Sequence, residues 1–117
     1  EIEEKKPEPV AGCEQYRSKV EAVFGAYTEE ALFVAKSESG CQNIKSKQMN
    51  RNGTWDYCIF QINNEPSALE IDKCIKRAWD KFKGSGFVWR QWYAVCPKDK
   101  KTGKQYQKFD HIPCFKR

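Results

Sequence analysis

Residues 50–63 read NRNGTWDYCIFQIN, and the prediction of the fold starts from this stretch. The dipeptide Asn52-Gly53 is the strongest short sequence signal for a β-hairpin turn. Aromatic and β-branched residues follow it, so we expect a strand whose side chains point alternately to two faces. Asp56 lies on one of these faces. An acidic residue in the middle of such a strand is either an edge charge that faces water, which is the commoner case, or a functional group.

Two helices are predicted before the hairpin. Apolar residues at helical spacing indicate a first helix over residues 14–24. Thr28 is the expected N-cap of a second helix, which has two glutamates in its first turn. Gly40 is expected to end that second helix, because glycine is the usual residue just beyond a helix.

Two more helices are predicted after the hairpin. Residues 67–70 read SALE, which is the S-x-x-E pattern of a capping box, and open a third helix. Its expected buried stripe consists of Leu69, Ile71, Ile75, Ala78, Trp79 and Phe82. A short fourth helix over residues 87–95 carries Trp89 and Trp92, of which Trp92 is expected in the core. The prediction is therefore an α+β domain, mainly helical with one small antiparallel hairpin sheet.

Length and charge set the domain count and the class of partner. The 117 residues fit one domain, which we place at residues 13–117 behind a flexible leader of residues 1–12. The formal net charge of +5 suits an anionic polymer such as nucleic acid or the bacterial wall. No signature of a nucleic-acid-binding module is present, so nucleic acid is not predicted as a partner. No apolar run approaches about 18 residues, so no membrane span is predicted, and a monomer is the default expectation.

The cysteines indicate the compartment. Six of them stand at positions 13, 41, 58, 74, 96 and 114, without any CxxC pair. Zinc sites usually combine close cysteine pairs with histidines, and His111 is the single histidine, so neither a metal site nor a cofactor is predicted. Three disulfides are the better interpretation, which predicts a secreted, extracellular protein. Six cysteines allow about 15 pairings, and their spacing does not choose among them.

Glu38 and Asp56 are the carboxylates with a candidate catalytic role. Glu38 lies in the last turn of the second predicted helix and shares a face with Val34 and Ala35. An apolar face and the carbonyls of a helix end both disfavour an ionised carboxylate, although a glutamate beside a helix end is more often simply solvated. Glycoside hydrolysis needs two carboxyl groups in unlike environments, one protonated to donate to the leaving oxygen and one ionised to stabilise or trap the oxocarbenium centre.

Three segments resemble one superfamily of cell-wall enzymes. Residues 50–63 resemble the active-site hairpin of the c-type lysozymes and of the lysozyme-like bacterial lytic transglycosylases. The segment AKSESG at 35–40 is similar to the end of the catalytic helix in that superfamily, and WRQWYAVC at 89–96 resembles the tryptophan helix that lines the c-type cleft. The resemblance covers residues 13–96, and the chain from 97 on matches nothing in the pattern. It implies a lysozyme-like fold in which the hairpin forms part of a cleft.

The resemblance also implies roles for individual residues. Glu38 matches the general acid of the family, and Asp56 matches its second carboxylate. Trp89 matches the indole that packs on the acid, and Val88 matches the residue whose backbone contacts an N-acetyl group. Polar groups around the second carboxylate and the central sugar subsites are matched by Asn50, Asn52, Gln61 and Asn63. The implied activity is that of a lysozyme, which hydrolyses the β-1,4 bond between N-acetylmuramic acid and N-acetylglucosamine in peptidoglycan.

The sequence departs from the c-type pattern in two places. Cys58 stands where that motif usually has glycine. Residues 64–66, Asn-Glu-Pro, replace the long cysteine-bearing loop and its cleft tryptophans, which implies a more open cleft. Within this altered set of cysteines we expect the pairs Cys41–Cys58 and Cys13–Cys114.

Two other functions stay open at this point. A lytic transglycosylase would use Glu38 first as acid and then as base, would leave Asp56 secondary, and would give 1,6-anhydro products. A non-catalytic member would bind glycan or a partner on the same scaffold without turnover, since fold does not imply function. The products distinguish the three functions: a hydrolase gives reducing ends, a lytic transglycosylase gives anhydro ends, and a non-catalytic member gives no product.

Overall fold

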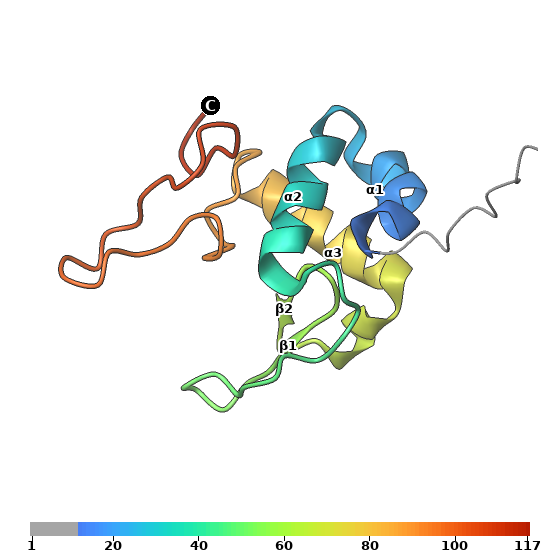
Figure 1. Cartoon of the computed structure of the whole chain (residues 1–117), viewed down its shortest axis with the longest axis horizontal. Helices are drawn as coiled ribbons and strands as arrows, with labels where there is room; N and C mark the ends of the chain where they lie inside the picture. The colour runs from blue at the N-terminus through green and yellow to red at the C-terminus, as the bar shows by residue number, and fades with distance from the viewer. Residues whose placement is uncertain (1–11) are drawn as a thin grey trace, which may run out of the picture.

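The computed structural model describes residues 12–117, which form a mainly helical fold with one small antiparallel sheet (Figure 1). This confirms the predicted α+β class. The elements are η1 (Gly12–Tyr16), α1 (Arg17–Phe24), η2 (Gly25–Tyr27), α2 (Thr28–Ser39), β1 (Asp56–Tyr57), β2 (Ile62–Asn63), η3 (Pro66–Leu69) and α3 (Ile71–Gly84). The leader predicted over residues 1–12 lies outside the described residues apart from Gly12, which begins η1. Across residues 12–117, no helix has the length and apolar character needed to cross a membrane.

Phe24, at the end of α1, lies at the centre of an aromatic core. Its ring centroid is 5.8 Å from those of Phe60 in the hairpin, Phe82 of α3 and Trp89 in the segment after α3. All four side chains are buried. Burying a side chain of this size contributes roughly 1.5–3 kcal/mol to stability. The core therefore holds the first helix, the hairpin, α3 and the following segment in fixed relative positions.

Two predicted helix caps are wrong. Thr28 is the first residue of α2 and not its N-cap, because η2 runs directly into α2 and the Thr28 hydroxyl donates to the carbonyl of Gly25 at 2.5 Å. Residues 67–70 form no capping box: Glu70 has an extended backbone without a side-chain cap, and α3 begins one residue later. Leu69 lies in η3 and is exposed, whereas the rest of the predicted α3 stripe is buried or partly buried.

A second turn interrupts the strand predicted after Asn52-Gly53. β1 pairs antiparallel with β2, with Asp56 opposite Asn63, and the chain reverses between them over residues 58–61. The alternation predicted for the whole stretch is therefore wrong. The physical reason is that Cys58 and Gln61 have φ of 74° and 50°, a left-handed conformation that residues other than glycine rarely adopt.

Residues 87–95 form successive turns, so the predicted fourth helix is wrong. The N–H of Trp89 donates to the carbonyl of Pro113 at 2.8 Å, far along the chain, and the N–H of Trp92 donates to the carbonyl of Trp89 at 2.9 Å. Phe87 has a φ of 62°, which a right-handed helix does not allow. Pairing with the C-terminal segment overrides the helical periodicity of this stretch.

The three disulfides are Cys13–Cys41, Cys58–Cys74 and Cys96–Cys114. The expected pairs Cys41–Cys58 and Cys13–Cys114 are therefore wrong. The chain leaving α2 returns toward η1, where the Cα atoms of Cys13 and Cys41 are 5.0 Å apart, while the turn at Cys58 faces α3. Disulfides of this kind are characteristic of oxidising compartments.

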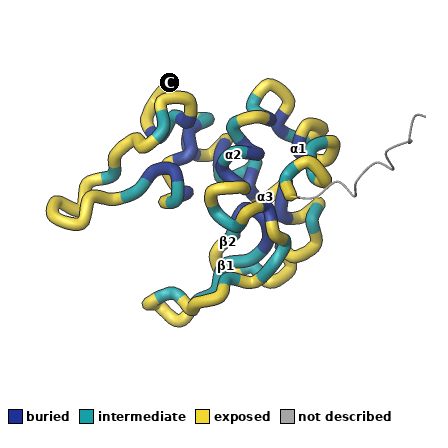
Figure 2. Tube along the Cα trace, viewed as in Figure 1, coloured by how far each residue is buried: buried dark blue, intermediate teal, exposed yellow. Residues whose placement is uncertain are grey.

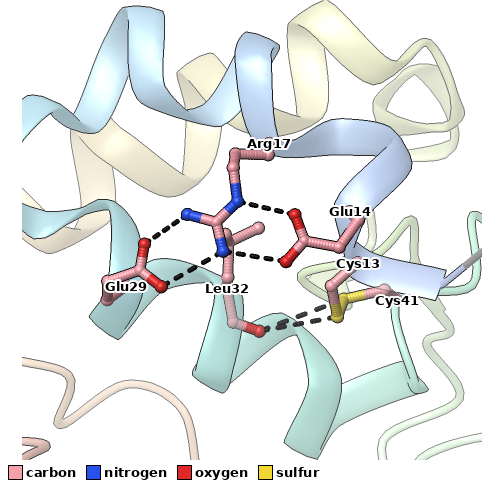
Figure 3. A network of polar contacts seen from close by, with 6 residues as sticks. All are labelled: Cys13, Glu14, Arg17, Glu29, Leu32 and Cys41. Atoms are coloured by element: carbon pink, nitrogen blue, oxygen red, sulfur yellow. Dashed lines mark hydrogen bonds and ion pairs between the residues drawn. A yellow bond between two sulfur atoms is a disulfide. The ribbon is translucent and has the colours of Figure 1, made fainter. Parts of the chain in front are cut away.

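An ion-pair network accompanies the first disulfide and fastens η1 and α1 to α2 (Figure 3). Arg17 lies between two carboxylates: it donates to Glu14 at 2.6 and 2.9 Å and to Glu29 through two N–H groups, one of them at 3.1 Å. The sulfurs of the disulfide lie 3.8 and 3.9 Å from the carbonyl oxygen of Leu32. Because exposed ion pairs each contribute about 1 kcal/mol or less, the covalent bond is the stronger restraint here.

Removal of the Cys58–Cys74 disulfide is expected to lower stability. Cys58→Ala with Cys74→Ala decreases the free energy of unfolding by about 3 kcal/mol, since the bond spans a sequence separation of 16. Cys58→Gly with Cys74→Ala costs about 1 kcal/mol less, because glycine adopts the φ of 74° without the steric cost met by alanine. Urea unfolding of both double variants and the wild type measures these differences. Equal stability of the two variants would contradict a left-handed backbone at position 58.

The chain after α3 forms the long arm on the left of Figure 1. The base of this arm belongs to the core, with Cys96 and Cys114 buried and joined to each other. Its outer part, residues 98–108, is mostly exposed (Figure 2). Arg117 ties the end of the arm to the helices through an ion pair with Glu30 of α2 at 2.5 Å.

Candidate active site

A cavity of about 650 Å³ lies among the end of α2, the hairpin, α3 and the segment that follows α3. Its lining consists of Glu38, Asn50, Arg51, Asn52, Asp56, Gln61, Asn63, Lys81, Gln91, Trp92, Tyr93 and Ala94. Six of the eight predicted site residues are brought together here, namely Glu38, Asn50, Asn52, Asp56, Gln61 and Asn63. The other two predicted residues, Val88 and Trp89, do not line the cavity.

The end of α2 positions Glu38. Gly40 ends this helix in the left-handed conformation, as predicted. The hydroxyl of Ser39 donates to the carbonyl of Ile59 at 2.7 Å, which ties the last turn of α2 to the hairpin. The neighbouring Glu38 is thereby held at the boundary between helix and sheet and lines the cavity.

The surroundings of Glu38 favour its protonated form. Burial raises the pKa of Glu38 to about 7. The backbone N–H of Ala94 donates to its carboxylate at 3.2 Å and acts against that rise, while the negative charge of Asp56 adds to it. Glu38 therefore keeps its proton in a pH range where an ordinary glutamate has lost it.

Asp56 lies on β1 in polar surroundings. Its Oδ1 accepts hydrogen bonds from the side-chain amides of Asn50 at 3.1 Å and Asn63 at 3.0 Å. Both amides also donate to the hydroxyl of Thr54, at 3.2 and 2.8 Å. The strand register explains the second contact, since it sets Asn63 opposite Asp56. The cavity thus holds one partly buried carboxyl group and one carboxylate oriented by two amides.

Asn52 and Gln61 line the cavity and also stabilise the two turns of the hairpin. The Oδ1 of Asn52 accepts hydrogen bonds from the N–H and the hydroxyl of Thr54, at 3.2 and 2.6 Å, in the predicted turn, where Gly53 has a φ of 82°. The amide of Gln61 donates to the carbonyl of Cys58 at 2.8 Å. Within residues 12–117, the Asn52 amide N–H₂ and the Gln61 side-chain carbonyl have no protein partner, so both are available to a ligand.

Trp89 and Val88, which are predicted to contribute to the cleft, lie outside the cavity lining. Trp89 is fully buried in the core, and its indole N–H donates to Glu30 at 2.8 Å. Val88 is buried as well. Trp92 belongs to the core, as predicted, and it also borders the cavity and donates its indole N–H to the carbonyl of Phe60 at 3.0 Å. The cause is the absence of the predicted helix, because turns present a different set of side chains to the cavity.

Five further lining residues carry little sequence signal: Arg51, Lys81, Gln91, Tyr93 and Ala94. Ala94 acts through its backbone N–H, which no sequence pattern marks. Lys81 is one of 21 lysine and arginine residues and has no distinctive spacing. Tyr93 stands directly beside Trp92, and that adjacency is the one signal that could have identified it.

The functional assignment rests on the cavity. Within residues 12–117, no three His, Cys, Asp or Glu side chains gather into a group that could hold a metal ion. Comparison of the chain with protein-family models, curated proteins and solved structures gave no match. The chemistry of Glu38 and Asp56 therefore carries the interpretation.

The raised pKa of Glu38 predicts a pH-dependent contribution to stability. Because the pKa is about 7 in the folded protein against an ordinary 4.5, the contribution is complete below about pH 4.5 and is lost as the pH rises through about 7. Relative to the wild type, Glu38→Gln is therefore expected to gain at most about 3 kcal/mol between pH 4 and pH 8. Urea unfolding of both proteins at the two pH values measures this gain. A difference between the proteins that does not change with pH would contradict the burial of this carboxyl group.

Proposed function

We propose that this protein is a glycoside hydrolase of lysozyme-like fold that cleaves the β-1,4 bond between N-acetylmuramic acid and N-acetylglucosamine in peptidoglycan. The observation that carries the proposal is the presence, in one cavity, of a partly buried Glu38 with a pKa of about 7 and of an amide-bound Asp56. Two carboxyl groups in unlike environments are what glycoside cleavage requires.

Glu38 acts as the general acid in this proposal. Near neutral pH a large fraction of Glu38 is protonated, and the proton passes to the glycosidic oxygen as its bond to the anomeric carbon breaks. The N–H of Ala94 then stabilises the carboxylate that remains. In the second half of the reaction, this carboxylate accepts a proton from the water that attacks the anomeric carbon.

Asp56 supplies the negative charge that faces the anomeric carbon in this proposal. Its carboxylate stabilises the positive charge that develops at the anomeric carbon, or attacks that carbon and forms a covalent intermediate. Asn50 and Asn63 keep the carboxylate oriented without neutralising its charge. An oriented carboxylate needs little reorganisation when the positive charge appears, which lowers the barrier.

The rest of the cavity suits an amide-bearing sugar. Asn52 and Gln61 offer unused amide and carbonyl groups, and the exposed Tyr93 offers aromatic surface. Binding sites for small molecules combine apolar walls with a few such convergent polar groups. The three disulfides support an extracellular location, where peptidoglycan is the accessible substrate.

Incubation of the protein with purified peptidoglycan tests the proposal. We expect the wild type to release soluble fragments with new reducing ends, and Glu38→Gln to release none above background while binding the insoluble wall equally well. Binding by the wild type without release of fragments would contradict the hydrolase and leave a glycan-binding protein. Release of fragments that end in a 1,6-anhydro sugar would instead identify a lytic transglycosylase.

A further inference from the structure

The cavity wall holds two cations in addition to the two carboxyl groups. Arg51 comes from the hairpin, and Lys81 comes from the last turn of α3. Burial lowers the pKa of Lys81, and the positive charge of Arg77 adds to this effect, while Glu65 and Asp56 act against it. Lys81 is therefore a partly desolvated cation beside the proposed catalytic carboxylate.

Lys81 differs from Lys76 and Arg77 of α3 in its partners. Lys76 pairs with Asp80 at 2.7 Å, and Arg77 pairs with Glu65 at 2.8 Å. Within residues 12–117, neither an ion pair nor a side-chain hydrogen bond joins the Lys81 ammonium to the protein. A partly buried ammonium whose donors are unused by the protein is suited to a ligand that brings an acceptor into the cavity.

The charge of the cavity favours an anionic ligand. With Glu38 protonated, as the proposed acid must be, the lining holds two positive charges, Arg51 and Lys81, and one negative charge, Asp56. A cleft lined with an excess of one sign concentrates ligands of the opposite sign. A neutral polymer of N-acetylglucosamine would leave the Lys81 ammonium without a charged partner.

We propose that Lys81 forms a carboxylate-binding subsite, with Arg51 adding to the positive field, so that the cavity selects acidic over neutral glycans. The proposal rests on the proposed function and specifies its substrate class. The group recognised is a carboxylate on the glycan itself, such as the lactyl carboxylate of an N-acetylmuramic acid that bears no peptide. An ammonium forms a charge-assisted hydrogen bond to such a group.

Two peptide-free oligomers of alternating N-acetylglucosamine and N-acetylmuramic acid provide the test, one with free lactyl carboxylates and one with the same groups as methyl esters. The wild type is expected to show a kcat/KM about tenfold higher for the free acid, as a charged hydrogen bond provides. Lys81→Met is expected to lose this preference by losing rate on the acid alone. Lys81→Arg is expected to restore it, and Lys83→Met, an exposed lysine on the same helix, to leave it unchanged.

A purely structural role of Lys81 predicts a different pattern. Equal losses on the acid and the ester in Lys81→Met, or an unchanged preference for the acid, would overturn the subsite. Calorimetric binding of both oligomers to the wild type and Lys81→Met separates this result from the proposed function. Preferential binding of the acid that depends on Lys81, without cleavage of either oligomer, would support the subsite and contradict the glycosidase. Binding without preference would overturn the subsite whether or not cleavage occurs.

Discussion

Replacement of Glu38 by glutamine is expected to lower kcat for peptidoglycan cleavage by on the order of 10³-fold. Glutamine is close to protonated glutamate in shape and keeps an oxygen that can accept the N–H of Ala94, but it has no acidic proton for the leaving oxygen. The loss therefore falls on the chemical step and not on substrate binding, so KM is expected to change little. Steady-state measurement of new reducing ends gives both constants.

Glu21→Gln is the matched control for this variant. Glu21 is an exposed residue of α1 that does not line the cavity, and the substitution makes the same chemical change from carboxyl to amide. It is expected to keep wild-type kcat. Turnover by Glu38→Gln at the wild-type rate, or an equal loss in both variants, would contradict the role of Glu38 as the acid.

Asp56→Asn is expected to lower kcat by on the order of 10²-fold, the effect typical of a lost electrostatic contact to the transition state. Asparagine retains an oxygen for the amides of Asn50 and Asn63 but removes the negative charge opposite the anomeric carbon. The same change is expected to lower the pKa of Glu38, because the charge of Asp56 contributes to its rise. The alkaline limb of the pH profile of kcat/KM is therefore expected to move to lower pH.

Asp110→Asn serves as the control, since Asp110 is exposed and lies on the C-terminal arm. We expect neither a loss of turnover nor a shift of the pH profile in this variant. Full turnover by Asp56→Asn would contradict the role assigned to Asp56. If the products of this variant also end in a 1,6-anhydro sugar, Glu38 would be the one carboxyl group that the reaction needs.

The local sequence predicts the two carboxylates and their immediate supports. Gly40 ends α2 as expected and so fixes Glu38 in the last turn, while the Asn52-Gly53 turn brings Asn50 toward Asp56. These features depend on residues close together in the chain, for which turn and cap preferences are informative. The polar residues around Asp56 are predicted from the resemblance of residues 50–63 to a known hairpin.

The remaining features depend on contacts between distant parts of the chain. Cys58 takes a left-handed backbone, a conformation that favours glycine, and bonds to Cys74 of α3, which spacing alone does not reveal. The backbone N–H of Trp89 donates to the carbonyl of Pro113, so the predicted helix does not form. As a result, Trp92 and not Trp89 borders the cavity. Tertiary hydrogen bonds and disulfides here outweigh local propensity.

Digestion of peptidoglycan in water enriched in heavy oxygen, followed by mass spectrometry of the soluble fragments, tests whether the protein cleaves the glycan by hydrolysis. If Glu38 and Asp56 catalyse hydrolysis, water adds to the anomeric carbon, and each new reducing end formed by the wild type carries one heavy oxygen. The Glu38→Gln variant is expected to give no labelled fragments. Fragments from the wild type that end in an anhydro sugar without label, or the absence of any soluble fragment from folded wild-type protein, would contradict hydrolysis by Glu38 and Asp56.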